Sequence, residues 1–382
     1  MKNLNLKIAV LKIGGRLAVN SRATSGGVNE IFKIFRYFKD YVGKVDFYTK
    51  VLPSDEKSDE FNIINFNYDT LKQINKNNYD ILMVFNGNAN FFGGAEDPLS
   101  LFNYMAINKF DGKVIYCLTD LNLILKQIWK VVASKPWGSK YNIDDLKIER
   151  DDIYVLSQAA VNNKIHKQFV KNGINLKSKN IFHFPWEQFV VFNEPEHDDV
   201  EKEVDIIYGG TFRSGKREKD FIKYYFGYPE DIKVEMFGKI KLEQFKRKEA
   251  KELRPPMFSK PLDYNQYMIK TATGLSSIII ADPLYKDSSM RTTRIFECIK
   301  ANNITFIDKE YYTKTEFFYR DNKILNEFCV VNSRDDVIDR LRFIKNKPEY
   351  FDKIIKLQQK AISHITKESY YDNLLKLLEN IV

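Results

Sequence analysis

Cysteine and histidine are scarce in this 382-residue sequence, and neither forms a recognisable ligand pattern. The three cysteines, Cys117, Cys298 and Cys329, stand far apart among apolar neighbours, so we expect neither disulfides nor a zinc site and infer a cytoplasmic setting. The four histidines also lack metal-site spacing, and no protein-held metal is expected. Long apolar runs are missing, and the first residues lack a signal-peptide core, so no membrane association is expected.

What the chain does contain is typical of a globular protein of more than one domain. Hydrophobic residues make up 44% and charged residues 29% of the sequence, and 382 residues exceed the size of one ordinary core. The formal net charge of +9 favours an anionic partner such as nucleic acid. Charge alone leaves a second explanation open, because a coding bias toward Lys, Asn, Ile and Tyr raises the charge in the same way.

Short apolar runs alternate with helical patterns along both halves of the chain, which is typical of doubly wound α/β domains. The expected strands of the first half are residues 8–13, 45–48, 81–85, 114–118 and 153–156, and those of the second are 205–208, 234–237, 277–281, 304–307 and 328–331. A polar, acidic stretch with Pro185 and Pro195 separates the halves. We therefore expect two Rossmann-like domains, with ligands at the carboxyl ends of the strands.

The segment VDIIYGGTFRSGKRE, residues 204–218, is the richest candidate for an anion site. A strand runs into a glycine turn, and Arg213 and Arg217 precede an expected helix. Main-chain N–H groups at such a helix start, together with arginines, suit phosphate groups. The segment is neither a Walker A loop nor a GxGxxG fingerprint, so a solvated basic turn remains the alternative.

Two further segments place charged residues after strands. In IIIADPLYKDSSMRTTRIFECIK, residues 278–300, Arg294 and Glu297 share a helix face and suit a diphosphate and ribose hydroxyls; an intrahelical salt bridge is the alternative. Asp120 ends the strand VIYCLTD and is either a general base or the N-cap of the next helix.

The segment NGNANFFGG, residues 86–94, combines glycines with two adjacent phenylalanines. Its apolar tip suits insertion into a base stack. Ordinary core packing of Phe91 and Phe92 is the alternative.

Taken in order, these motifs resemble the DNA β-glucosyltransferase family of T-even bacteriophages. The resemblance is carried by NANFFGG, LTD followed by QIWKVVASKPW, DIIYGGTFRSGKRE, VEMFGKIKLEQFK, and IIIADPLYK followed by TTRIFE, and it spans nearly the whole chain. It implies an α/β protein of the GT-B fold, with two Rossmann-like domains, an interdomain cleft and a C-terminal helix returning to the first domain. The implied domains are residues 1–189 with 366–382, which bind DNA, and residues 190–365, which bind the nucleotide sugar.

The resemblance also implies an activity. The family consists of inverting hexosyltransferases that move glucose from UDP-glucose to the hydroxyl of 5-hydroxymethylcytosine in double-stranded DNA. The product is β-linked, and the acceptor base is flipped into the cleft. UDP-glucose is then the donor, Mg²⁺ can assist its diphosphate, and a phage-encoded, monomeric enzyme working in the host cytoplasm is expected.

Individual roles carry over onto matching positions. Asp120 matches the catalytic base. The positions that match donor contacts are Glu30, Thr211, Phe212, Arg213, Arg217, Gly238, Leu262, Asp282, Tyr285, Arg294 and Glu297. The positions that match DNA contacts are Asn90, Phe92 and Lys135.

Two departures from the family pattern keep other functions open. Residues 14–27 form a longer loop before Glu30, and one extra residue separates Tyr285 from Arg294. A different UDP-sugar, for example a pentose, or a different modified base is therefore the first alternative. A non-catalytic DNA-binding or inhibitor protein is the second, although such a protein would not need Asp120.

Overall fold

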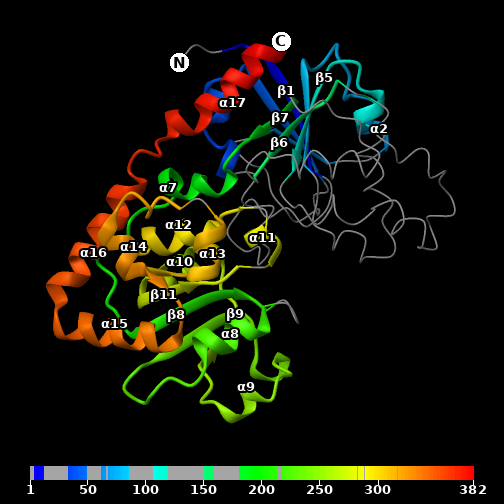
Figure 1. Ribbon diagram of the computed structural model, residues 1–382. Coiled ribbons are helices and arrows are strands. Elements are labelled where there is room, and N and C mark those ends of the chain that lie inside the picture. The colour runs from blue at the N-terminus through cyan, green and yellow to red at the C-terminus, as the bar shows by residue number, and fades with distance from the viewer. Residues whose placement is uncertain are drawn as a thin grey trace. The chain divides into compact units, whose positions relative to one another are not determined.

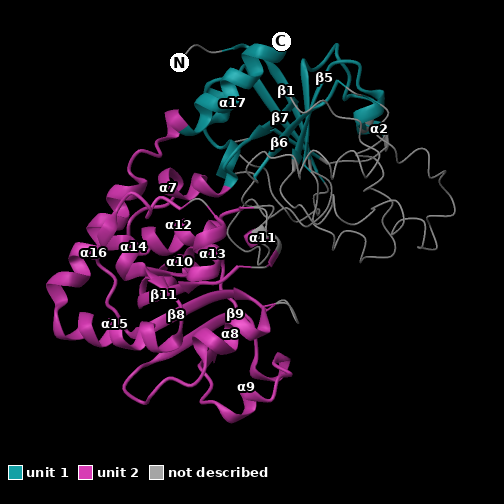
Figure 2. Ribbon diagram, viewed as in Figure 1, with its two compact units in different colours: residues 1–186, 370–382 teal, residues 187–369 magenta. Residues whose placement is uncertain are grey.

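The computed structural model of the chain describes residues 4–12, 33–49, 62–65, 68–85, 106–118, 150, 152–158, 180–212, 217–281, 283–287, 289–315 and 317–382. These residues belong to two compact units (Figure 2). Unit 1 comprises Met1–Trp186 and Tyr370–Val382, and unit 2 comprises Glu187–Ser369. Unit 2 is therefore one continuous stretch of chain, whereas unit 1 is assembled from two stretches.

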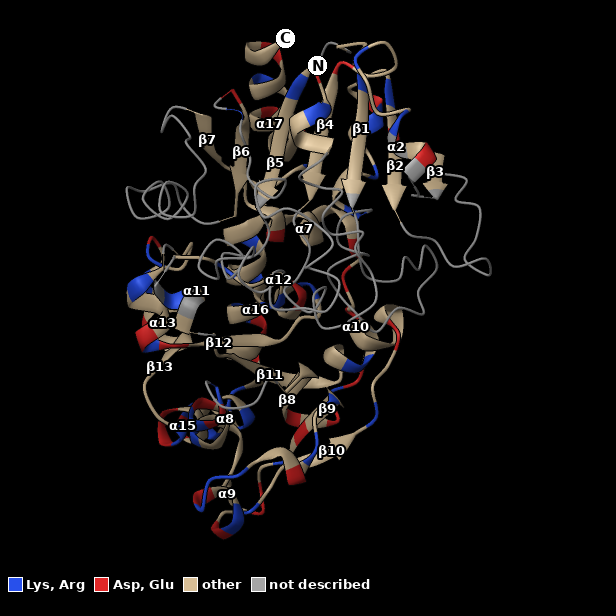
Figure 3. Cartoon of the chain, turned by 90° about the vertical axis from the view of Figure 1, so that its right-hand side faces the viewer, with Lys and Arg blue, Asp and Glu red and all other residues tan. Residues whose placement is uncertain are grey.

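Unit 1 (Figure 1) is built on one parallel sheet, and its strand order among the described residues is β3-β2-β1-β4-β5-β6-β7 (Figure 3). The strands are β1 (Lys7–Lys12), β2 (Lys44–Thr49), β3 (Asn62–Asn65), β4 (Ile81–Phe85), β5 (Lys113–Leu118), β6 (Tyr154–Ser157) and β7 (Ile181–His183). All five residues of β4, the sequence ILMVF, are buried. This continuous apolar character is expected of a central parallel strand that is covered on both faces.

The other described elements of unit 1 are short, apart from the C-terminal helix. They are η1 (Phe38–Asp40), α2 (Tyr68–Leu71) and α17 (Lys367–Ile381), while η7 (Trp186–Gln188) begins at the end of the unit. Tyr371 of α17 is fully buried, and its hydroxyl donates a hydrogen bond to the carbonyl of Ile34. Tyr370 donates to the carbonyl of Trp186 at 3.3 Å. The expected return of the C-terminal helix to the first domain is confirmed.

Unit 2 is built on a second parallel sheet, with the order β10-β9-β8-β11-β12-β13 among the described residues. The strands are β8 (Val204–Thr211), β9 (Val234–Lys239), β10 (Met257–Ser259), β11 (Gly274–Ile279), β12 (Ile304–Asp308) and β13 (Val330–Val331). Numbered from β8, this is the Rossmann order 3-2-1-4-5-6. The topology turns at the β8–β11 pair, which is where such sheets bind ligands.

Helices join the strands of unit 2. They are α7 (Phe189–Asn193), α8 (Glu218–Tyr225), η8 (Leu242–Gln244), α9 (Glu249–Glu252), α10 (Tyr264–Ala272), α11 (Pro283–Asp287), α12 (Thr293–Lys300), α13 (Lys309–Lys314), α14 (Lys323–Cys329), α15 (Arg334–Asn346) and α16 (Pro348–Ile362). Basic and acidic residues interleave on α8, α9 and α15 (Figure 3). The charges of these three helices therefore cancel.

Most predicted strands are found, with end points shifted by a few residues. The clearest error concerns residues 328–331, which were expected to form a strand. Helix α14 continues through Cys329, and only Val330–Val331 pair with β12. Residues 33–41, between β1 and β2, contain a short helical turn and η1.

Candidate functional site

The carboxyl ends of β8 and β9 form the floor of the candidate site in unit 2. Gly210 pairs with Gly238 across the two strands, and both adopt a positive φ, +155° and +118°. A Cβ atom on Gly238 would lie 2.0 Å from the carbonyl oxygen of Gly210. Both positions therefore require glycine, since a side chain at Gly238 would collide with the neighbouring strand.

Arg294, on the first turn of α12, lies directly against this glycine pair. A Cβ on Gly210 would approach the Arg294 guanidinium to 2.8 Å. The guanidinium stacks on the ring of Tyr208, 4.4 Å from the centroid. Its Nη1 atom is buried and has no hydrogen-bond partner among the described residues. Arg294 thus presents an unsatisfied cationic donor at the strand ends, which is the chemistry of an anion site.

The protonation of Arg294 is secure. Burial by itself would lower the pKa of the guanidinium, but the neighbouring Tyr208, Tyr267 and Glu297 outweigh burial and raise the pKa above its usual value. The side chain therefore carries its full charge at every working pH.

Glu297, one turn further along α12, is 7% exposed and is held by two tyrosines of α10. The hydroxyl of Tyr267 donates to Oε2 at 2.8 Å, and that of Tyr264 donates to Oε1 at 3.3 Å. Arg294 and Glu297 do share a helix face, and Glu297 contributes to the raised pKa of Arg294. Two hydroxyl groups of α10, one on each carboxylate oxygen, therefore orient Glu297, so an intrahelical salt bridge is not its sole restraint.

Three other predicted donor contacts follow β8. Thr211 is the exposed last residue of the strand. The ring of Phe212 is buried against Phe221 and Phe245, with centroids 5.7 and 4.5 Å away. The side chain of Phe212 is therefore held in the core of unit 2, and only its main chain is left to contact a ligand. Arg217 directly precedes α8, and its buried Nε atom has no hydrogen-bond partner among the described residues.

Leu262 and Tyr285, two further predicted donor contacts, have different surroundings in unit 2. Leu262 packs with Tyr267 against a buried cluster that includes Phe237. Tyr285 is half-buried on α11, and its carbonyl accepts a hydrogen bond from the amide of Met290 at 3.0 Å.

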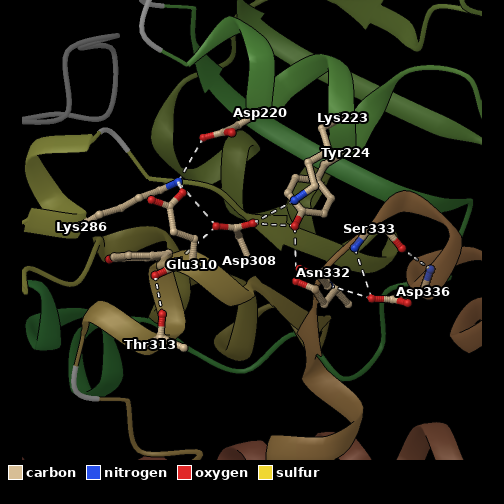
Figure 4. Close-up of polar contacts among 12 residues, drawn as sticks. Asp220, Lys223, Tyr224, Lys286, Asp308, Glu310, Thr313, Asn332, Ser333 and Asp336 are labelled. Atoms are coloured by element: carbon tan, nitrogen blue, oxygen red, sulfur yellow. Dashed lines mark hydrogen bonds and ion pairs between the residues drawn. The ribbon is translucent and has the colours of Figure 1, made fainter.

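A buried ion network anchors α11 next to Tyr285 (Figure 4). The ammonium of Lys286, 5% exposed, contacts Asp220 on α8 at 3.3 Å, Asp308 at the end of β12 at 3.5 Å and Glu310 on α13 at 2.8 Å. Tyr224 also donates to Asp308, at 2.5 Å. Lys286 thus links its own helix, α11, which also carries Tyr285, to α8, the helix that follows Arg217.

The remaining predicted site residues lie outside the described residues. They are Asp120, Glu30, Arg213, Asp282, Asn90, Phe92 and Lys135. Asp120 follows Leu118, the last residue of β5, and Asp282 follows Ala281, just past β11.

The sequence did not draw attention to Tyr264, Tyr267 or Lys286. The two tyrosines stand three apart on one helix, a spacing that predicts a shared face but not its partner. Within the described parts of the chain, His, Cys, Asp and Glu form no group of three or more that could hold a metal ion. No helix in those parts is long and apolar enough to cross a membrane.

Comparisons with known proteins agree with this geometry. The family described as bacteriophage T4 beta-glucosyltransferase matches residues 47–190. The DNA beta-glucosyltransferase of Enterobacteria phage T4 is 29% identical over 297 residues, covering 76% of this chain and 80% of that protein. T4 phage BGT in complex with UDP and Mn²⁺ matches with a TM-score of 0.77 at 25% identity, over 97% of this chain and 99% of that one.

A more distant solved structure shares the architecture. An alpha-glucosyltransferase in complex with UDP-glucose and DNA containing an abasic site matches with a TM-score of 0.63 at 11% identity, over 98% of this chain and 99% of that one. Together the comparisons confirm the GT-B fold and the resemblance predicted from the motifs.

Proposed function

We propose, from its likeness to the DNA β-glucosyltransferases, that this chain is an inverting glycosyltransferase that moves glucose from UDP-glucose to 5-hydroxymethylcytosine in double-stranded DNA. The observation that carries the proposal is the group at the switch point of unit 2: Arg294 with an unpartnered donor nitrogen against the Gly210–Gly238 pair. A diphosphate at this position would supply the missing acceptor. The buried, unpartnered Nε of Arg217 supports the same ligand.

The remaining donor contacts follow from this placement. Glu297 would accept the ribose hydroxyls, and Gly238 and Leu262 would line the uridine. Glu30 would contact the sugar. Thr211, Phe212, Arg213, Asp282 and Tyr285 complete the proposed donor site.

The chemistry is a single displacement. The hydroxymethyl oxygen of the acceptor attacks the anomeric carbon of glucose, its proton passes to the carboxylate of Asp120, and the bond from that carbon to UDP breaks. Attack opposite to the leaving group converts the α-linked donor into a β-linked product. A positioned base contributes about 10²–10⁴-fold. Arg213, Arg217 and Arg294 would stabilise the charge that develops on UDP, which is commonly the larger effect.

Mg²⁺ is proposed only as an assistant of the diphosphate, where it would share the charge with the arginines. We assign it no residues of this chain and no step of the reaction.

The acceptor base lies inside a duplex and must leave the stack before it can react. We assign this part of the function to unit 1, where Asn90 and Phe92 would occupy the space left by the flipped base. Lys135 would lie near the DNA backbone. A monomer acting in the cytoplasm of the phage host completes the proposal.

Replacement of the base tests the mechanism. Asp120→Ala should leave the Kd for UDP-glucose, measured by calorimetry, within about twofold of the wild-type value. Glucose transfer to hydroxymethylated DNA should fall by about 10²-fold or more. Strong residual transfer would remove Asp120 from its role. Lys314→Met, which alters an exposed side chain of unit 2, is the matched control and should keep wild-type transfer.

Mass spectrometry of hydroxymethylated DNA, incubated with several UDP-sugars, tests donor and acceptor together. A hexose mass shift supports the proposal. A pentose shift would instead support the alternative suggested by the longer loop before Glu30. Absence of transfer from every donor would leave a DNA-binding protein without catalytic activity.

A further inference from the structure

The ribose-binding carboxylate proposed above is unusually well held. Both oxygens of Glu297 accept hydrogen bonds from tyrosine hydroxyls of the same helix, α10. The two tyrosine rings stack on each other with centroids 5.8 Å apart. The arrangement therefore fixes the carboxylate by two donors that are themselves packed together.

Tyr267 is locked from several sides. Its ring contacts that of Phe237 on β9, with centroids 5.4 Å apart. A Cβ on Gly209 would lie 2.5 Å from the Tyr267 ring, so the strand passes directly over it. Burial raises the pKa of the Tyr267 hydroxyl well above its usual value, and the hydroxyl remains a donor at any working pH. The carboxylate of Glu297 can act only as an acceptor, and its two oxygens have lone pairs left for further donors.

We infer that Tyr267, assisted by Tyr264, is a positioning residue that sets the enzyme's preference for a ribonucleotide over a 2′-deoxyribonucleotide donor. The inference rests on the proposed function, because it assumes that UDP binds with its ribose at Glu297. A fixed carboxylate can accept from neighbouring ribose hydroxyls without losing rotamer freedom. A site built to bond a hydroxyl rejects the analogue that lacks it, because a buried polar group is then left unpaired.

The test compares the Kd values of UDP and dUDP by calorimetry. The wild-type protein should bind UDP about tenfold or more tightly than dUDP. Tyr267→Phe should reduce that ratio several-fold, chiefly by weakening UDP. Tyr264→Phe should reduce it less, since its hydrogen bond is 3.3 Å rather than 2.8 Å. In combination with Glu297→Gln, the Tyr267→Phe change should have little additional effect on the ratio.

A matched control separates positioning from general packing. Tyr319→Phe removes another tyrosine hydroxyl of unit 2, one that is fully buried and donates to Gln358 at 2.9 Å. This variant should lose stability but keep the wild-type ratio. A Tyr267→Phe protein with the wild-type ratio would overturn the inference.

The inference and the proposed function fail in different ways. Equal wild-type affinity for UDP and dUDP would overturn the inference while leaving the glycosyltransferase proposal intact. Failure of the wild-type protein to bind UDP or UDP-glucose would count against the proposed function itself.

Discussion

Removal of the Lys286 ammonium should strongly destabilise unit 2. Lys286 and Asp308 have side chains that are each 5% exposed, and Asp220 is 22% exposed. A Lys286→Met substitution keeps most of the side-chain volume but leaves two largely buried carboxylates without this cation. Asp308 retains Lys223 at 3.4 Å and the Tyr224 hydroxyl, whereas Asp220 loses the lysine with which it forms its ion pair.

The expected loss in the free energy of unfolding comes from leaving a buried charge without its partner. Breaking a buried ion pair by removing one partner costs about 3–5 kcal/mol. For a unit of this size, that corresponds to a fall in Tm of roughly 6–20 °C. Burial already raises the pKa of Asp220, and Lys286 opposes that rise. The variant should therefore recover stability as the pH falls, because protonation removes the unpaired charge.

The assay must report on unit 2. All three tryptophans, Trp129, Trp137 and Trp186, belong to unit 1, so their fluorescence is unsuitable. Hydrogen exchange of peptides from α8 and α11 is suitable, because both helices belong to unit 2. Lys223→Met is the matched control, because Lys223 also contacts Asp308 but is 38% exposed and should cost less than about 1 kcal/mol. Equal losses in the two variants, or a Lys286→Met loss that is independent of pH, would refute the reasoning.

Two further predictions concern the strand ends and the edge of the ion network. Gly238→Ala should weaken UDP binding, measured by calorimetry, at least tenfold, because its Cβ would collide with Gly210. The control Gly227→Ala is also at a positive φ but outside the site, and it should lower stability without changing the Kd for UDP. Hydrogen bonds from Lys286 and Lys314 lower the pKa of Glu310 to about 2, below its unfolded value. The stability that Glu310 contributes is therefore present above about pH 4.5 and is lost as the pH falls toward 2. Above pH 4.5 the free energies of unfolding of wild type and Glu310→Gln, measured by urea titration, should differ by on the order of 0.5–1 kcal/mol for so exposed a side chain. The two values should converge as the pH falls toward 2, and a difference that persists to pH 2 would contradict this prediction.

The central strands could be predicted from sequence because each is a continuous apolar run, as in the ILMVF of β4. Short edge strands gave no such signal. β3 reads NIIN and β10 reads MFS, and pairing with a neighbour, rather than local propensity, makes them strands. The opposite error occurred at residues 328–331, where FCVV reads as a strand although Phe328 and Cys329 complete a helix.

The site was predictable only in part, for a related reason. The Arg-x-x-Glu spacing is a local pattern, and it indicated Arg294 and Glu297. The glycine turn expected after Tyr208 is wrong, because β8 continues through both glycines to Thr211. The partners of those residues come from distant sequence: Tyr267 lies 30 positions from Glu297, and Asp220 lies 66 positions from Lys286. Such pairs arise from the topology of the sheet, which the sequence pattern indicates only in outline.

The path of α17 has a practical consequence for dissecting the protein. Because Tyr370 and Tyr371 are buried in unit 1, a clone that stops before them would deprive the N-terminal half of part of its interior. Residues 187–369, by contrast, can be expressed as one uninterrupted fragment. Truncation at both ends thus isolates unit 2, the unit proposed to bind the nucleotide, whereas an isolated N-terminal half would need the last helix supplied, for example through a circularly permuted gene.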